Sequence, residues 1–259
     1  MNNPASPPVE RRGRNVPAWS WSLIGLRLAA LLLALTVCCA LYYLCAAFVS
    51  RNPVPRRFLG TAALISGVRV RTSGTPAAAH TFFLANHVSW LDILALAGQT
   101  GTAFVAHDGL AAIGPLRWLC ELNDTVFIAR HDRNSIAAQV KQVRAAMNET
   151  GGLTIFPEGT TSDGTGLLPF KSSLLSALEA DADHFPVQPV ALDYGPQAAS
   201  IAWVGSETGL DNALRILARW RPVDLTITFL PALSAAERAN RKTMARAASE
   251  TIAASLKHP

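Results

Sequence analysis

The sequence predicts an α/β fold, a mostly parallel central sheet flanked by helices, preceded by an N-terminal segment of two helices. Three observations predict it. Past residue 76, short apolar segments of strand length alternate with segments of helical periodicity. Residues 28–49 form an apolar run in which Thr36 is the single polar residue. Chemically active side chains follow two of the predicted strands, at the edge where parallel sheets bind ligands.

The N-terminal segment divides into a tail and a hairpin. Residues 1–18 are rich in proline, asparagine and arginine, which predicts a disordered basic tail. As a helix, the run 28–49 would be about 33 Å long, enough to span a bilayer core or to lie in it at a tilt. A Pro-containing break and a shorter apolar segment, 58–68, follow. We therefore predict a two-helix membrane anchor at residues 19–75, spanning or monotopic. A buried core helix is the alternative, which the uninterrupted apolar run disfavours.

The charge distribution also indicates a membrane partner. Residues 1–71 hold nine arginines and one acid, Glu10, whereas the rest of the chain holds 14 basic and 17 acidic residues, for a net charge of +5. A basic, apolar segment beside a near-neutral domain favours an anionic lipid surface. It does not favour nucleic acid, which requires positive charge on the folded domain. Arginines flank both ends of the apolar run, so the positive-inside rule gives no orientation, as expected of a monotopic hairpin.

Residues 76–259 are predicted to form one α/β domain without internal repeats. Strands are predicted at 81–85, 102–106, 125–129, 153–156, 187–192, 201–204 and 225–229. Helices are predicted at 89–98, 133–149, 171–181, 211–219 and 234–256. The last of these starts with a capping box formed by Ser234 and Glu237.

The first chemically informative segment is Asn86–Asp92, at a strand-to-helix junction. It contains His87 and Asp92, five residues apart. Within one helix two such residues would point about 140° apart, so the side chains converge only if His87 precedes the helix and Asp92 lies in its first turn. Ser89 as N-cap gives that arrangement. In the purely structural interpretation, Asp92 only closes a capping box with Ser89.

The second segment follows the predicted strand 153–156. Pro157 ends this strand, and Gly159 lets the backbone approach another group closely. Glu158 either binds hydroxyl groups of a ligand or ties the loop to a backbone amide. Further on, Lys171 lies in the first turn of a predicted helix, where lysine opposes the helix dipole, which indicates an anionic partner.

Together these motifs resemble those of the glycerolipid acyltransferase family, which includes 1-acylglycerol-3-phosphate acyltransferases. Four family motifs occur in order within residues 82–193. They are N-H-x-x-x-x-D at Asn86, His87 and Asp92, an apolar strand ending in arginine from Val126 to Arg130, F-P-E-G-T from Phe156 to Thr160, and V-x-P-V from Val187 to Val190. One such motif is a weak signal, whereas four in order are specific.

The resemblance implies a membrane-bound O-acyltransferase with a catalytic domain at residues 76–259. His87 would be the general base that activates a lipid hydroxyl, and Asp92 would orient its ring. The remaining substrate-binding residues would be Asn86, Arg130, Glu158, Gly159, Thr160 and Lys171. Arg130 and Lys171 would hold an anionic head group, unless they are a salt-bridged strand-end residue and a solvated helix residue.

The resemblance also implies the partners of the reaction. It needs no cofactor, because acyl-CoA or acyl carrier protein supplies the acyl group as a thioester. These donors are cytosolic, so the domain would face the cytoplasm at the inner membrane. The acceptor expected first is 1-acylglycerol-3-phosphate, which gives phosphatidic acid. Thr161 stands where many phosphate-acceptor members have arginine, and His107 where the family often has lysine. These departures make lyso-ornithine lipid the alternative acceptor.

Two further classes of function stay open: a membrane lipid-binding protein without catalysis, and a thioesterase or lipase in which water is the acceptor. The sequence does not support a nucleophile from the protein itself. It has no G-x-S-x-G segment, and Cys120 lies beside Trp118 and Leu119, which indicates a buried thiol. No metal site is predicted, because the six histidines show no ligand spacing such as H-E-x-x-H.

Overall fold

The computed structural model of the protein describes residues 17–49, 52–77, 80–107, 126–128, 136–179 and 184–256. The predicted tail lies outside this range up to residue 16, as do Arg130 and Cys120.

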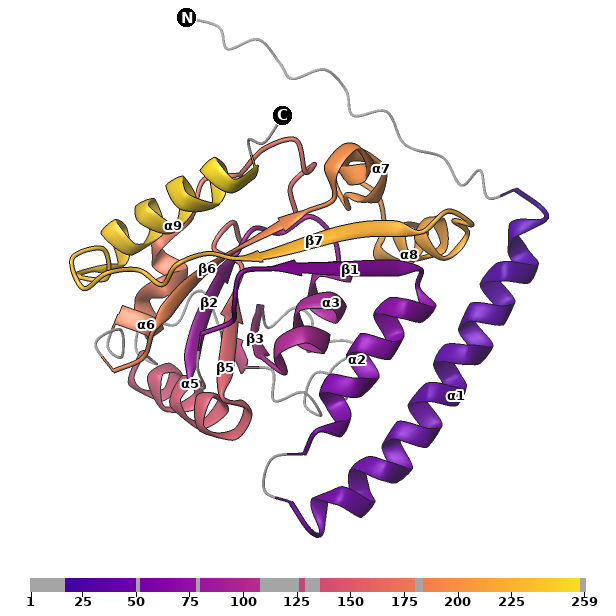
Figure 1. Cartoon of the computed structure of the whole chain (residues 1–259), viewed down its shortest axis with the longest axis horizontal. Helices are drawn as coiled ribbons and strands as arrows, with labels where there is room; N and C mark the ends of the chain where they lie inside the picture. Colours follow the sequence, from indigo (N-terminus) through magenta and orange to yellow (C-terminus); the bar gives the residue numbers. More distant parts are fainter. Residues whose placement is uncertain are drawn as a thin grey trace, which may run out of the picture.

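A seven-stranded sheet in the order β1-β7-β6-β2-β5-β3-β4 forms the centre of the described fold (Figure 1). β2 pairs in parallel with both β5 and β6, β3 with β5, and β4 with β3, whereas β7 is antiparallel to β6 and β1 runs parallel to β7. The predicted mostly parallel sheet is therefore confirmed. The strands are β1 (Val68–Ser73), β2 (Thr81–Ala85), β3 (Ala103–His107), β4 (Val126–Ile128), β5 (Gly152–Ile155), β6 (Val187–Asp193) and β7 (Val223–Phe229).

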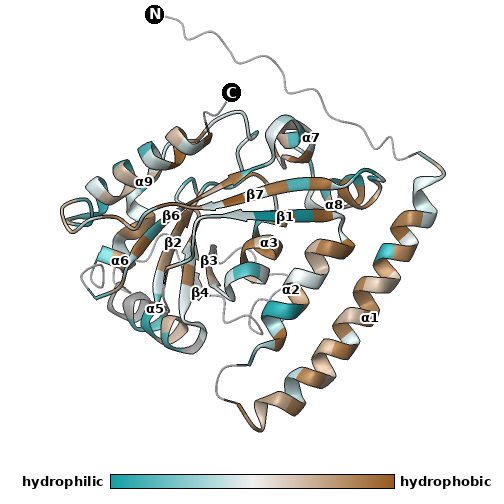
Figure 2. Cartoon of the chain, in the orientation of Figure 1, coloured by the Kyte–Doolittle hydropathy of each residue, from teal (hydrophilic) through white to brown (hydrophobic). Residues whose placement is uncertain are grey.

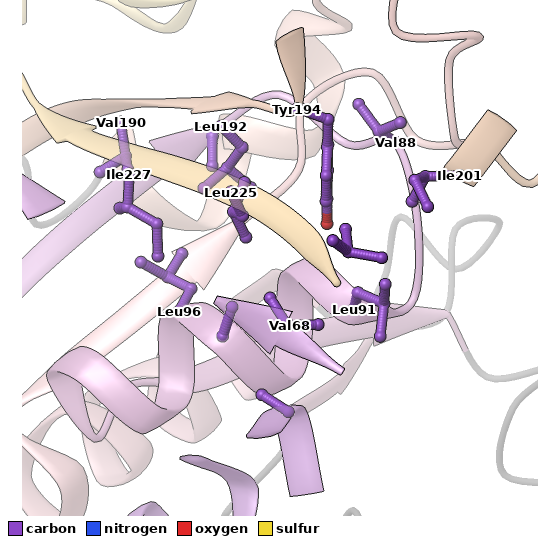
Figure 3. Packing of buried hydrophobic residues seen from close by; sticks show 14 of the residues in the cluster. Val68, Val88, Leu91, Leu96, Val190, Leu192, Tyr194, Ile201, Leu225 and Ile227 are labelled. Carbon is purple, nitrogen blue, oxygen red and sulfur yellow. The ribbon is translucent and has the colours of Figure 1, made fainter. Parts of the chain in front are cut away.

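Helices cover both faces of the sheet, and each face has its own hydrophobic core. β2 is buried along its whole length because alternate residues enter opposite cores: Phe83 joins the cluster that contains Leu96, shown in Figure 3, whereas Phe82 joins the cluster that contains Met147. The described helices are α1 (Ser20–Ala46), α2 (Val54–Ile65), α3 (Leu91–Thr100), α5 (Ile136–Thr150), α6 (Ser176–Glu179), α7 (Ala198–Ile201), α8 (Gly209–Leu217) and α9 (Arg241–Leu256).

The predicted helical hairpin is present as α1 and α2, and it is fastened to the domain by two arginines. Nη1 of Arg27 donates to the carbonyl oxygens of Leu217 at 3.0 Å and Arg219 at 2.9 Å, at the end of α8. Arg56 donates from Nε to the carbonyl oxygen of Gly98 at 3.2 Å, at the end of α3. Both guanidinium groups thus satisfy carbonyls that have no partner within their own helix. Figure 2 shows that α1 is apolar over most of its length.

α2 also packs closely on α3. A Cβ placed on Gly98 would lie 2.6 Å from Cα of Gly60, closer than two such atoms can approach. The two backbones therefore meet at a pair of glycines, which fixes the position of α2 on the domain.

Two predictions about strands are corrected. β1 was not predicted, because Val68–Ser73 falls in the range 19–75 that was assigned to the hairpin; the strand instead pairs with β7 at the edge of the main sheet. The predicted strand 201–204 is wrong. Ile201 ends α7, and the backbone N–H of Trp203 donates to the carbonyl oxygen of Val88 at 3.0 Å, in a loop, not a ladder.

Two predicted helices are shorter than expected. Within the predicted helix 171–181, the described residues 171–179 form a 3-10 turn, η3 (Ser172–Leu175), and the single turn of α6, whereas residues 180 and 181 lie outside the described range. The last helix begins at Arg241, not at Ser234. The capping box does form, because Glu237 Oε2 accepts from the backbone N–H of Ser234 at 2.7 Å, but it closes a separate turn. Asn240 caps α9 instead, since its Oδ1 accepts from the backbone N–H of Thr243 at 3.0 Å.

Candidate active site

Three neighbouring parallel strands bring the candidate site together at their carboxyl ends. His87 follows β2, Glu158 follows β5 and Tyr194 follows β6. Because β2 lies between β5 and β6, the residues that follow these strands converge on His87.

His87 and Asp92 form a direct pair, as the spacing predicted. His87 lies in the loop before α3, Asp92 lies in the first turn of that helix, and Nδ1 of His87 is 2.9 Å from Oδ2 of Asp92. Asp92 is completely buried, whereas 17% of the His87 side chain is exposed. A carboxylate can only accept a hydrogen bond, so Nδ1 carries the hydrogen and Nε2 carries the lone pair.

The same carboxylate also closes the start of α3. Oδ2 of Asp92 accepts from the backbone N–H groups of Val88 at 2.7 Å and Ser89 at 2.9 Å. The capping and catalytic interpretations therefore describe one carboxylate. Ser89 is not the side-chain cap that we expected. Trp90 precedes the helix instead, and the Ser89 hydroxyl accepts a long bond of 3.4 Å from the backbone N–H of Leu91.

Tyr194 completes the support of Asp92 and was missed by the sequence analysis. Its hydroxyl donates to Oδ1 of Asp92 at 2.5 Å. Figure 3 shows this hydroxyl pointing into the core, on the side where Leu91 begins α3. Burial, followed by the negative charge of Asp92, raises the pKa of Tyr194 well above its ordinary value, so the residue remains a protonated donor. In the sequence, the position of Tyr194 just after the V-x-P-V strand was the signal that could have indicated its place in the site.

The ring of His87 is fixed by a second contact. It stacks on Phe156 with centroids 4.0 Å apart and planes 13° from parallel. Its backbone is held as well, since the carbonyl oxygen of His87 accepts from the N–H of Ser162 at 2.7 Å. The imidazole is thus held on its edge by Asp92 and on its face by Phe156, which leaves Nε2 as the ring nitrogen for a substrate.

Glu158 ties the loops of the site together. Its Oε1 accepts from the backbone N–H of His87 at 2.8 Å, and its Oε2 accepts from the backbone N–H of Leu168 at 3.0 Å. Of the two roles that we predicted, the geometry favours the structural one. Burial raises the pKa of Glu158 to about 6, although the two backbone N–H groups act in the opposite direction.

Asn86 has a similar supporting geometry. Its side chain exchanges two hydrogen bonds with the backbone of Leu192, donating at 2.9 Å and accepting at 2.8 Å. This pairing joins the ends of β2 and β6, one residue before His87 and two residues before Tyr194. Its amide therefore holds together the two segments that carry the proposed catalytic group and its support.

Three other predicted substrate-binding residues lie in the loops after β5, whereas Arg130 lies outside the described residues. Gly159 has a φ of +70°, in the left-handed region that favours glycine, and Thr160 is exposed. Lys171 is exposed and precedes η3, so it does not lie in a helical first turn as predicted. Thr161 directs its hydroxyl to the carbonyl oxygen of Trp203. The part of the chain that the structure describes contains no cluster of three or more histidine, cysteine, aspartate or glutamate side chains that could hold a metal ion.

The fold and the motifs at its strand ends define an α/β acyltransferase. A family model described as Acyltransferase matches residues 67–193. The chain is 31% identical to the lyso-ornithine lipid O-acyltransferase of Rhizobium meliloti, over 78% of this chain and 74% of the relative. It is 32% identical to the 1-acyl-sn-glycerol-3-phosphate acyltransferase of Neisseria gonorrhoeae, over 74% of this chain and 76% of the relative.

The fold has a counterpart of known structure. The 1-acyl-sn-glycerophosphate acyltransferase of Thermotoga maritima superimposes with a TM-score of 0.60 over 90% of this chain and 95% of that chain, at 17% identity. This likeness supports the fold, and the two sequence relatives establish the family. The chain belongs to the glycerolipid acyltransferase family and is an O-acyltransferase.

Proposed function

We propose that this protein transfers a fatty acyl group from acyl-CoA or acyl carrier protein to the free hydroxyl of a lysolipid, with His87 as the general base. The observation that carries the proposal is the 2.9 Å contact between Nδ1 of His87 and buried Asp92. It supports a fixed tautomer in which Nε2 accepts a proton, the requirement for activating a hydroxyl near neutral pH.

The proposed reaction takes place in one site. The acceptor oxygen attacks the thioester carbonyl carbon while Nε2 of His87 removes the hydroxyl proton. The tetrahedral intermediate then collapses, the C–S bond breaks, and the thiolate leaves with the proton that His87 carried. Asp92 stabilises the imidazolium during this step, and Tyr194 keeps Asp92 in position by its bond to Oδ1.

The loop after β5 favours lyso-ornithine lipid as the acceptor over the phosphate-bearing acceptor that the sequence suggested first. Thr161 replaces the arginine expected for a phosphate, and its hydroxyl is engaged with the backbone at Trp203. Position 161 therefore lacks a guanidinium group, which could form a bidentate hydrogen bond with a phosphate. The relative from Rhizobium meliloti, a lyso-ornithine lipid O-acyltransferase, supports this choice. The relative from Neisseria gonorrhoeae keeps 1-acylglycerol-3-phosphate as the second candidate.

The anchor supports binding to one face of a membrane. Among the described residues, α1 is the helix long and apolar enough to cross a bilayer. Both ends of the hairpin are attached to the domain, however, through Arg27 near the start of α1 and Arg56 near the start of α2. A helix that crosses a bilayer separates its two ends by the thickness of the membrane. We therefore propose a monotopic hairpin, with the domain on the cytoplasmic face of the inner membrane.

The test is acyl transfer by detergent-purified protein from a labelled thioester, with lyso-ornithine lipid and 1-acylglycerol-3-phosphate assayed side by side. We expect product mainly on lyso-ornithine lipid and a loss of about 10²- to 10⁴-fold in His87→Ala. His184→Ala is the matched control, because His184 is an exposed histidine. Transfer that survives His87→Ala would refute the mechanism. Thiol release without any acceptor would identify a thioesterase, and product mainly on the phosphate-bearing acceptor would overturn the acceptor choice.

A further inference from the structure

A hollow of about 420 Å³ lies between the start of α1 and the end of α8, and no step of the proposed reaction uses it. Two indole rings lie at its edge, with 61% of Trp19 and 75% of Trp220 exposed. Three arginines also line it: Arg215, Arg219 and Arg221. Exposed apolar side chains rimmed by polar ones mark interaction sites, which makes this Trp–Arg hollow a candidate binding surface.

The charges of these arginines are not equally compensated. Arg215 is paired with Glu207, since Nε lies 2.7 Å from Oε1 and Nη2 lies 2.9 Å from Oε2. Arg219 contacts only neutral groups among the described residues, the Ser200 hydroxyl at 3.2 Å and the Gln197 side-chain oxygen at 3.4 Å. Its buried Nε has no hydrogen-bond partner there.

Arg219 therefore has the character of a cation that lacks a counter-ion. Burial, followed by the charge of Arg215, lowers the pKa of Arg219 from its ordinary value. Arg221 is exposed and forms no ion pair with the carboxylates that the structure describes. An anion in the hollow would supply the missing charge to Arg219 and Arg221.

The position of the hollow indicates where this anion comes from. It adjoins the start of α1, whose exposed apolar residues begin with Trp21 and continue through Leu26 and Leu28. In Figure 2 this helix is apolar over most of the length that follows the hollow. Tryptophan prefers the headgroup level of a bilayer, and guanidinium binds phosphate. A free phosphate would account for the arginines but not for the indole rings.

We propose that the Trp–Arg hollow binds the phosphate of an anionic phospholipid in the membrane surface, while α1 lies among the acyl chains beside it. The lipid in this role is part of the bilayer, not the reacting acceptor. The proposal rests on the proposed membrane-bound function, but it assigns to a defined part of the surface a preference for anionic lipid.

The test is flotation of purified protein with vesicles of phosphatidylcholine, and with vesicles in which part of this lipid is replaced by phosphatidylglycerol. The variant is Arg219→Gln/Arg221→Gln. The matched control is Lys242→Gln/Arg246→Gln, which removes two exposed charges from α9, on the far side of the domain (Figure 1). We expect binding to the anionic vesicles to fall about 30-fold in the variant, at about fivefold per charge. Binding to neutral vesicles should be equal in all three proteins.

Equal binding of the variant and the control to anionic vesicles would overturn the proposal, and so would a failure of the unaltered protein to prefer these vesicles. Inorganic phosphate separates the two sources of phosphate: if it displaces the protein fully from anionic vesicles, the site is one for free phosphate. Trp220→Ser, a change at an exposed residue, provides a second variant and should weaken binding to both kinds of vesicle. Acyl transfer in detergent, measured on the same variants, tests the proposed function separately and should be unchanged.

Discussion

The hydroxyl of Tyr194 lies 2.5 Å from Oδ1 of Asp92, while Oδ2 of the same carboxylate lies 2.9 Å from Nδ1 of His87. The three side chains thus form a continuous hydrogen-bonded row from the core to the surface of the site. The order of the strands holds all three in place, since Tyr194 follows β6, which pairs with β2, and His87 follows β2. A buried carboxylate remains charged at low cost only where each oxygen has a donor, and Tyr194 is the donor on the side facing the core.

Tyr194→Phe should therefore lower kcat for acyl transfer about 10- to 100-fold, because a hydrogen bond to a buried charged group is removed. KM should change little, since the hydroxyl contacts Asp92 and not the substrate. Steady-state kinetics, corrected for the folded fraction by circular dichroism, measure both quantities. Tyr43→Phe, on the exposed side of α1, is the matched control. A loss no larger than the loss of folded protein would show that Tyr194 is only a packing residue.

Glu158 should make stability depend on pH. Its folded pKa of about 6 lies above its ordinary value of 4.5. The folded state therefore holds the proton more tightly, and this stabilisation is complete below pH 4.5 and lost as the pH rises through about 6. The loss amounts to about 2 kcal/mol. Denaturant unfolding in detergent between pH 4.5 and 7 measures it.

Glu158→Gln should remove most of this pH dependence, because glutamine resembles the protonated acid at every pH. Glu250→Gln, at an exposed position on α9, should keep the slope of the unaltered protein. Identical slopes in all three proteins would mean that the Glu158 carboxyl titrates alike in the folded and unfolded chain.

The contact between α2 and α3 provides a stability prediction with an internal control. Gly98→Ala would place a Cβ 2.6 Å from Cα of Gly60, so the helices must separate, and we expect a loss of about 1–3 kcal/mol. Gly25→Ala, in α1, has open space within 4 Å and should be neutral or stabilising by up to about 1 kcal/mol. Thermal unfolding in the same detergent compares the two. Equal effects would indicate that helix propensity, not the close approach, decides the outcome.

Arg27→Gln should loosen the joint between α1 and α8. The carbonyl oxygens of Leu217 and Arg219 lose a charged donor, which predicts a cost of about 1–3 kcal/mol. Hydrogen exchange should become faster in the first turns of α1 and the last turn of α8, while β2 and β5 keep their protection. Arg246→Gln removes an exposed arginine from α9 as the control. Unchanged exchange in α8 would mean that apolar contacts alone hold α1 on the domain.

The sequence predicted the local part of the site, and the structure adds the part that depends on strand order. His87 and Asp92 are five residues apart, so their convergence follows from helix geometry. Tyr194 is 102 residues from Asp92 and becomes its partner only because β6 pairs with β2, which no local pattern reveals. The same reason explains why Asn86 was expected to bind substrate: its partner, Leu192, lies 106 residues away.

The helices and strands likewise divide into those that a local sequence pattern predicts and those that depend on the tertiary fold. The parallel strands β2, β5 and β6 were predicted because buried strands form continuous apolar runs. β1 escaped prediction because it lies at the edge of the sheet and alternates Val68, Arg69, Val70 and Arg71 directly after the apolar hairpin. The wrong strand at 201–204 was an apolar segment whose burial comes from packing beside the site loop, since Ile201 and Ala202 are buried without a ladder.

Both joints between the hairpin and the domain, at Arg27 and Arg56, combine a permanent cation with neutral backbone oxygens. Neither partner gains or loses a proton in the physiological range, and neutral oxygens bind no competing counter-ion strongly. When α1 rests in a bilayer, the hairpin therefore acts as a spacer of constant height. With the proposed monotopic anchor, the distance from the lipid surface to His87 would then be set by the chain itself, and we expect an acceptor to be selected partly by how far its free hydroxyl rises above the acyl chains.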